Sequence, residues 1–163
     1  MALGGVRCTR VSDRRVELAV GEEGYLRGHW GLLRGLRSAL RTEPNVRFAA
    51  VFGSVARGDA REGSDVDLLV DLADSSWTRH QPLNTRLERQ FDRSVELVLL
   101  ARVREENPSL LVDVLREGRV LVDRDGVWSE LRRQEPSLRR VAQADQTRRA
   151  NEARAAVDEL TAP

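Results

Sequence analysis

Two apolar runs separated by a polar loop dominate the pattern of hydrophobic and polar positions along this chain. The first run, residues 46–52, is β-branched and aromatic enough for a buried strand, and Gly53 ends it. The second run opens with Asp65 and Asp67, whose side chains share one face because successive strand residues alternate. Ser54 ends the first run and Asp65 begins the second, so both must lie at the same sheet edge. We therefore expect two antiparallel neighbouring strands.

Helical and strand periodicities follow one another along the rest of the chain. The predicted elements are a helix over 24–42, a helix over 77–89, a strand over 93–100, a helix from Asn107-Pro108 to Gly118, and a short strand over 120–122. Pro82 is tolerated only in the first turn of a helix, which favours a start later than Trp77. The crossover helix makes the strands on either side of it parallel, so the sheet is mixed.

These elements predict an α+β fold, close to α/β, in which helices pack on a small mixed sheet. We expect a core domain over residues 25–126, an N-terminal hairpin or arm over 1–24, and a helical extension over 127–163. In the extension, a helix from Trp128 is interrupted or kinked at Pro136 and resumes to Leu160. Its second part carries few apolar residues, so it is either solvated or docked on a partner.

Composition narrows the function classes. Of 163 residues, 40% are hydrophobic, which is enough for one core, and the net charge of +1 gives no whole-chain argument for binding nucleic acid or membrane. All 27 Lys and Arg positions are arginine, so a cationic phosphate clamp here must be arginine. Cys8 is alone, no apolar stretch is long enough to span a bilayer, and no signal-peptide pattern is present. We expect a cytoplasmic protein.

The junction after the first strand has the chemistry of an anion site. Gly53 permits a sharp turn, Ser54 is expected to cap a short helical turn over 55–57, and Gly58 ends that turn. Free N–H groups at a helix start attract phosphate. The carboxylates of Asp65 and Asp67 repel each other unless a cation lies between them, and magnesium suits such oxygen ligands together with substrate phosphates.

These two segments, Gly53-Ser54-Val55-Ala56-Arg57-Gly58-Asp59 and Ser64-Asp65-Val66-Asp67-Leu68-Leu69-Val70, resemble the MNT-type minimal nucleotidyltransferases of the DNA polymerase beta-like superfamily. The resemblance implies a nucleotidyltransferase domain over 25–126 and a third carboxylate on the next strand. Glu96 supplies it, where the family more often has aspartate, and the otherwise apolar strand around it favours a metal ligand or base.

The resemblance also implies the roles of the site residues. Gly53 and Ser54 would hold the phosphates of a nucleoside triphosphate, with ATP as donor. Asp65, Asp67 and Glu96 would bind Mg²⁺, in a two-metal site. Arg57 is a candidate for phosphate charge, and Arg61 is a weaker one.

Minimal members of this family often act as antitoxins beside a helical HEPN-type ribonuclease toxin and transfer AMP to it. The resemblance therefore implies an antitoxin that forms a complex with a partner protein and modifies it, so we expect a homo- or hetero-oligomer. From the charge pattern and the lack of a spanning stretch, we expect no nucleic-acid or membrane partner. Two alternatives stay open. One is a small-molecule adenylyltransferase of the antibiotic-modifying kind, and the other is a catalytically silent binding module.

Overall fold

The computed structural model describes residues 22–61 and 63–161, without side chains at 22–28 and 158–161. The hairpin or arm predicted for 1–24 falls almost wholly outside the described residues. Helix α1 begins at Glu22, so only the last residues of that prediction can be compared, and they are helical.

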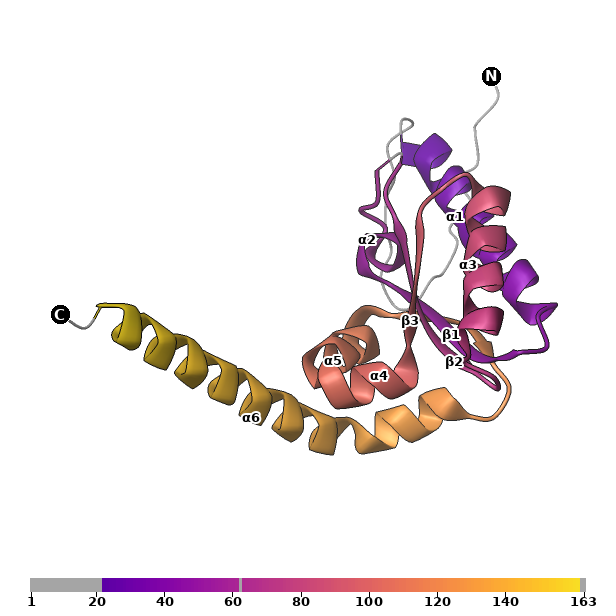
Figure 1. The fold of residues 1–163 in the computed structure, drawn as a ribbon. Coiled ribbons are helices and arrows are strands. Elements are labelled where there is room, and N and C mark those ends of the chain that lie inside the picture. Colours follow the sequence, from indigo (N-terminus) through magenta and orange to yellow (C-terminus); the bar gives the residue numbers. More distant parts are fainter. Residues whose placement is uncertain (1–21, 62, 162–163) are drawn as a thin grey trace, which may run out of the picture.

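A four-stranded mixed sheet in the order β3-β2-β1-β4 forms the centre of the fold (Figure 1). The strands are β1 (Val46–Phe52), β2 (Val66–Leu72), β3 (Val95–Leu99) and β4 (Arg119–Asp123). β1 is antiparallel to both β2 and β4, and β2 is parallel to β3. The predicted antiparallel pair, the parallel crossover and the mixed sheet are all confirmed.

Helices cover both faces of this sheet. The helices are α1 (Glu22–Arg41), α2 (Gly53–Arg57), α3 (Trp77–Phe91), α4 (Leu100–Glu106), α5 (Pro108–Glu117) and α6 (Val127–Thr161). One core cluster joins Leu36 of α1 and Leu87 of α3 to Val70 of β2. The other joins Leu111 of α5 and Leu131 of α6 to residues on the opposite face of the sheet. The alternation of β2 decides which residues enter each cluster.

Local signals in the sequence explain several boundaries. The backbone N–H of Leu110 donates to Oδ1 of Asn107 at 3.1 Å, so Asn107 caps α5, with Pro108 as the first helical residue. Two predicted boundaries were wrong. α3 starts at Trp77 and contains Pro82, although Pro82 favoured a later start. Leu100, which was predicted to be the last residue of a strand, instead begins the short helix α4.

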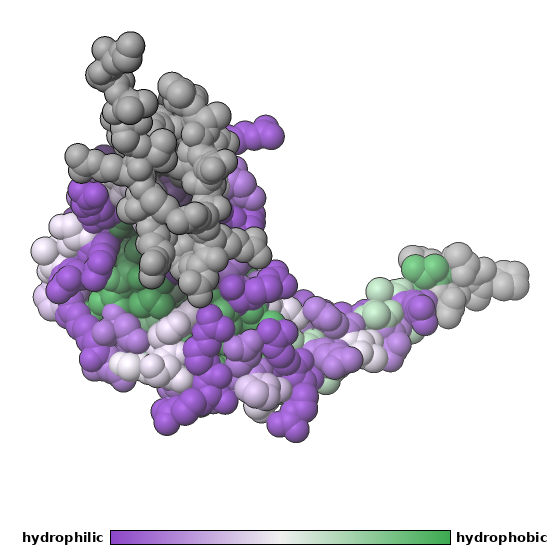
Figure 2. Space-filling model, turned by 180° about the vertical axis from the view of Figure 1, so that it is seen from behind, coloured by the Kyte–Doolittle hydropathy of each residue, from purple (hydrophilic) through white to green (hydrophobic). Residues whose placement is uncertain are grey.

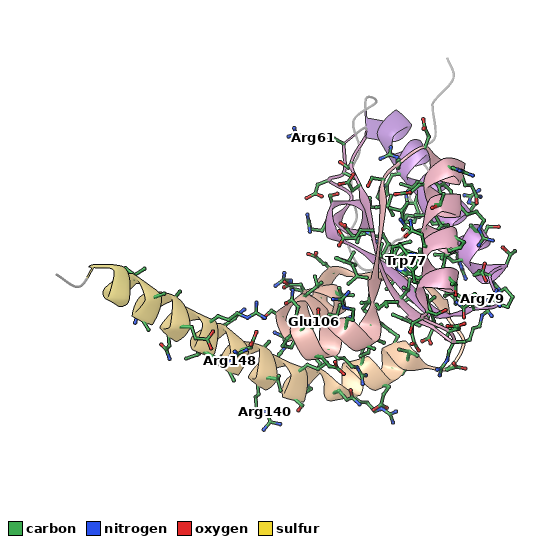
Figure 3. The ribbon with its side chains drawn as sticks, in the orientation of Figure 1. Arg61, Trp77, Arg79, Glu106, Arg140 and Arg148 are labelled. Atoms are coloured by element: carbon green, nitrogen blue, oxygen red, sulfur yellow. The ribbon has the colours of Figure 1, made fainter. Side chains whose placement is uncertain are left out.

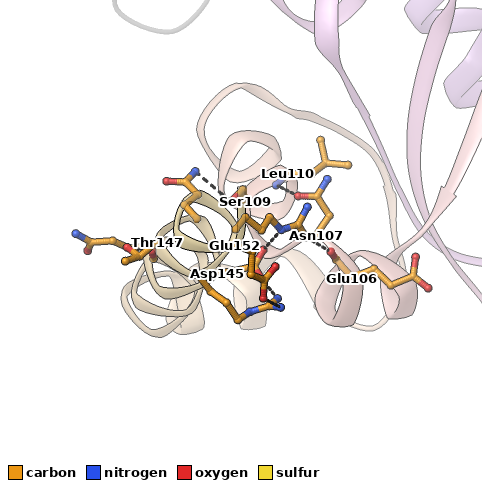
Figure 4. A network of polar contacts seen from close by, with 11 residues as sticks. Glu106, Asn107, Ser109, Leu110, Asp145, Thr147 and Glu152 are labelled. Atoms are coloured by element: carbon orange, nitrogen blue, oxygen red, sulfur yellow. Dashed lines mark hydrogen bonds and ion pairs between the residues drawn. The ribbon is translucent and has the colours of Figure 1, made fainter. Parts of the chain in front are cut away.

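Helix α6 is continuous over 35 residues and contains Pro136 without interruption, contrary to the predicted break. Its first part packs on α5 through Leu131 and Leu138. Further along, Gln146 donates to Oγ of Ser109 at 3.2 Å, and Arg149 donates to the carbonyl of Glu106 at 2.9 Å (Figure 4).

Beyond these contacts α6 projects from the domain (Figure 1), and its described side chains from 146 to 157 are all exposed. We call residues 146–161 the arm. Figure 2 shows the arm as mostly hydrophilic, with paler and apolar positions nearer its end. None of the helices in the described part of the chain is both long and apolar enough to cross a bilayer.

We expect Leu111→Ala to lower the free energy of unfolding by about 2–5 kcal/mol, because this fully buried side chain would leave a cavity between α5 and the sheet. The matched control is Val112→Ala on the same helix. Val112 is half-buried and outside both core clusters, so its loss should cost less than about 1 kcal/mol. Urea unfolding followed by circular dichroism measures both, and equal losses would contradict this account of the core.

Candidate active site

Strand pairing brings the ends of β1, β2 and β3 together at one edge of the sheet. Asp67 of β2 is paired with Phe52, the last residue of β1, and with Glu96 of β3. Neighbouring strands lie about 4.8 Å apart, so these positions are adjacent. Val66 and Leu68 enter the core on the other face, which leaves Asp67 and Glu96 together on one face. Asp65 immediately precedes β2 and is exposed.

Gly53 lies directly against the Asp67 carboxylate. Its φ is +67°, a left-handed conformation, and a Cβ built on it would collide with Oδ2 of Asp67. Two independent constraints therefore require glycine here: the backbone angle and the space that Asp67 occupies. The sharp turn that the sequence predicts at Gly53 thus brings its backbone against the Asp67 carboxylate.

The three carboxylates form a concentration of negative charge. Partial burial raises the pKa of Asp67 above its usual value, the nearby Glu96 and Asp65 raise it further, and Arg57 partly offsets these effects. Within the described part of the chain, none of these three side chains takes part in an ion pair or side-chain hydrogen bond. The fold therefore brings like charges together, and no cationic side chain that the structure describes is bonded to them.

Contacts among Arg61, Ser64 and Arg93 fix the chain just before Asp65. The backbone N–H of Arg61 donates to Oγ of Ser64 at 2.8 Å, which closes the turn. The guanidinium of Arg93 donates to the carbonyl of Ser64 at 3.2 Å. Sequence reasoning missed Arg93 because nothing distinguishes it from the many solvated arginines of this chain.

Helix α2 differs in one detail from its prediction. It begins at Gly53, and Ser54 lies inside the first turn, where no side-chain capping hydrogen bond forms. The predicted Ser54 cap was therefore wrong, while Gly58 does end the helix, in the left-handed conformation with φ 85°. From β4, Nε of Arg119 donates to the carbonyl of Ala56 and so ties α2 to the sheet.

The two arginines considered for phosphate binding occupy different surroundings. Arg57 pairs with Asp59 at 3.1 Å and with Glu117 at 2.9 Å, so a phosphate would have to exchange with these carboxylates. Arg61 is exposed and extends away from the sheet (Figure 3). Arg57 thus lies nearer to the carboxylates and contributes to their electrostatics, whereas Arg61 has no such contact in the structure.

The donor set suits a hard divalent cation. Asp65, Asp67 and Glu96 offer only carboxylate oxygens, which are the ligands that Mg²⁺ prefers, and their mutual repulsion favours a bound cation. As the side chains stand, no group of three or more Asp, Glu, His or Cys residues among those described is arranged to hold a metal ion. Binding would therefore require the side chains to reorient toward the cation.

Comparisons with known proteins find a matching family and similar structures. The sequence profile of the family described as polymerase beta nucleotidyltransferase matches residues 35–126. A protein of Thermococcus cleftensis named protein adenylyltransferase MntA is 36% identical over 87 residues, which cover 53% of this chain and 85% of that protein.

Two solved structures share the fold. One, described as a toxin–antitoxin with AMP-PNP, has a TM-score of 0.57 at 23% identity, and the match covers 80% of this chain and 98% of that chain. The other, a tri-AMPylated Shewanella oneidensis HEPN toxin in complex with MNT antitoxin, has a TM-score of 0.54 at 21% identity, and the match covers 82% and 99%.

We expect Gly53→Ala to destabilise the protein more than Gly63→Ala. Both glycines have positive φ, so each substitution costs about 1–2 kcal/mol of backbone strain. Gly63 has open space around it, whereas the new methyl at Gly53 would displace Asp67, which adds about 1–3 kcal/mol. Denaturant unfolding measures both, and in an Asp67→Ala background the excess should vanish. An excess that persists there would refute the contact as its cause.

We expect Asp67→Asn to raise the free energy of unfolding at pH 7 without added metal. The raised pKa means that the folded state binds more protons than the unfolded state between the usual and the raised value, so stability falls as pH increases through that window. Removing the charge removes this loss, and the difference should disappear toward pH ~3. Asp71→Asn on the same strand is the control, because Asp71 faces Arg47 at 3.8 Å and should not gain stability when replaced.

Proposed function

This chain belongs to the polymerase beta nucleotidyltransferase family, and we propose that it transfers AMP from ATP to a hydroxyl group of a partner protein. The observation that carries the proposal is Asp67, which lies between Gly53 and Glu96 with no ion-pair partner among the described residues. A site built in this way is electrostatically unfavourable when empty and becomes favourable with a cation and a polyphosphate.

The proposed reaction is a substitution at the α-phosphorus. The acceptor oxygen forms a bond to that phosphorus, the bond to the bridging α–β oxygen breaks, and pyrophosphate leaves. The acceptor hydroxyl loses its proton, and Glu96 would take it if it acts as the base. When bound, Mg²⁺ would supply charge neutralisation for the phosphates and for the attacking and leaving oxygens.

Each residue of the site would have a role that follows from its position in the sheet. Gly53 and Ser54 begin α2 directly after β1, and their backbone N–H groups would bind the phosphates. Asp65 and Asp67 would bind the Mg²⁺ that the triphosphate carries, and Glu96 would ligate a second cation or act as base. Arg57 would meet phosphate charge after exchanging with Asp59 and Glu117.

We propose an antitoxin role for this transfer, with a HEPN-type toxin as the acceptor. The matched relative is named a protein adenylyltransferase, and a structural neighbour contains an AMPylated HEPN toxin with its MNT antitoxin. In the described part of the chain there is a single small domain and the arm, without a second domain that could close over a small-molecule acceptor. A protein acceptor brings its own surface to the site.

Incubation with labelled ATP, Mg²⁺ and a purified helical HEPN-type protein tests the proposal. We expect the partner to gain the mass of one or more AMP groups. Asp65→Asn and Asp67→Asn should each lower transfer by at least about a thousandfold, because each removes a metal-binding carboxylate that acts in the transition state. Asp71→Asn, at the far end of β2, should leave the rate unchanged. Full activity of either aspartate variant in magnesium would refute these roles.

A further inference from the structure

A groove of about 400 Å³ begins at Glu96 and runs beside the edge strand β3. Its walls come from the start of α3, with Trp77 and His80, and from α4, with Arg102. The groove ends at Leu110 of α5. It thus connects the carboxylate proposed as base with the surface from which α6 departs.

Side chains of α3 occupy two of the backbone groups at the outer edge of β3 in this groove. His80 Nε2 lies 3.2 Å from the carbonyl oxygen of Leu97, and the N–H of Val95 donates to Glu88 at 3.4 Å. These contacts use backbone groups that an added strand would need. A polypeptide in the groove would therefore be recognised by its side chains and by the groove walls, not through β-pairing.

The lining suits a protein segment. Apolar side chains of β3 and α5, among them Val98 and Leu110, are half-buried along it. Trp77 lies at the rim of the groove and is 71% exposed, which is unusual for so large an apolar side chain (Figure 3). Exposed tryptophan beside a concave apolar surface is the residue type that most often anchors a protein partner. Arg102 and Glu106 add a charged pair to the groove wall.

The order of the strands assigns the two sides of the reaction. Gly53 adjoins β1, Asp67 is on β2 and Glu96 is on β3. In a displacement the attacking and leaving oxygens lie on opposite sides of the phosphorus. With pyrophosphate leaving on the Gly53 side, the acceptor must approach from the Glu96 side, which is where the groove opens.

The groove is also continuous with the root of the arm. Glu106 and Ser109, next to its far end, hold α6 through Arg149 and Gln146. A protein that lies against the arm can therefore extend a segment along the groove toward Glu96. We propose that this groove binds the acceptor segment of the partner protein, with Trp77 as its specificity-determining residue. This inference rests on the proposed transfer reaction.

The test compares Trp77→Ala, Trp77→Phe and the control Arg79→Ala, which changes an exposed residue of the same helix outside the groove. We expect Trp77→Ala to lower kcat/KM for AMP transfer to the HEPN-type protein at least tenfold, mainly through KM. Trp77→Phe should recover most of this loss, and Arg79→Ala should show none. Because Trp77 is exposed, thermal unfolding should confirm that all three variants fold.

Two further measurements separate the acceptor groove from other roles. Calorimetry should give a Kd for Mg·ATP within about twofold of the value for the unmodified protein in every variant. The rate at which ATP is hydrolysed to AMP and pyrophosphate, with water in place of the acceptor, should also be the same in every variant. A parallel loss of ATP affinity in Trp77→Ala would mean that the groove binds the base of the donor nucleotide. Unaltered AMP transfer in Trp77→Ala would mean that Trp77 does not contribute to binding the acceptor. Both results overturn the inference while leaving the transferase standing. If the unmodified protein transfers no AMP, the proposed function is overturned, and the assignment of the groove to an acceptor is overturned as well.

Discussion

The pairing of Asp67 with Glu96 across β2 and β3, next to the backbone of Gly53, is the constraint on which the rest of this structure depends. It places like charges side by side, where partial burial and mutual repulsion disfavour ionisation of Asp67. Such an arrangement persists only when surrounding structure holds it. Here two hydrophobic clusters, one on each face of the sheet, fix the strands and thereby the acids. The packing of the core thus offsets the electrostatic repulsion among the acids at the strand ends, as is common at functional sites.

Three arginine side chains bind backbone carbonyl or carboxylate groups near the acidic ends of these strands. Arg119 binds the carbonyl of Ala56 in α2, Arg93 binds the carbonyl of Ser64 before Asp65, and Arg57 links α2 to Glu117 of α5. The guanidinium group presents several donors in a fixed plane, so it suits such carbonyl and carboxylate contacts. These contacts secure the two segments that flank β1 and β2 at the site, and no described cation is bonded to the acids themselves.

Helix α6 divides the molecule into a packed part and an exposed part. Up to Ala142 its side chains reach the core, and Arg149 and Gln146 make its last contacts with α4 and α5. Beyond Arg149 the described side chains of the arm are exposed, and the ion pairs of Arg148 with Asp145 and Glu152 lie within α6 itself. A helical segment of this length is marginal in water without packing. Glu106 lines the groove that begins at Glu96 and also contacts α6, so the groove and the arm adjoin each other. In the proposed function the groove holds the acceptor segment and the arm contacts the rest of the partner.

Local patterns in the sequence determined the strands, the mixed sheet and the residues of the acidic edge, because period-two alternation and the glycine turn act over a few residues. The tertiary structure alone decided what happens where distant segments meet. Ser54 is an internal residue of α2, Leu100 starts a helix at the end of β3, and Pro136 lies inside a helix that packs on α5. Arg93, Arg119 and the groove beside Trp77 were likewise out of reach of sequence reasoning. Each depends on which carbonyl, carboxylate or apolar wall the folded chain brings within a few ångströms, and spacing along the sequence carries no record of that.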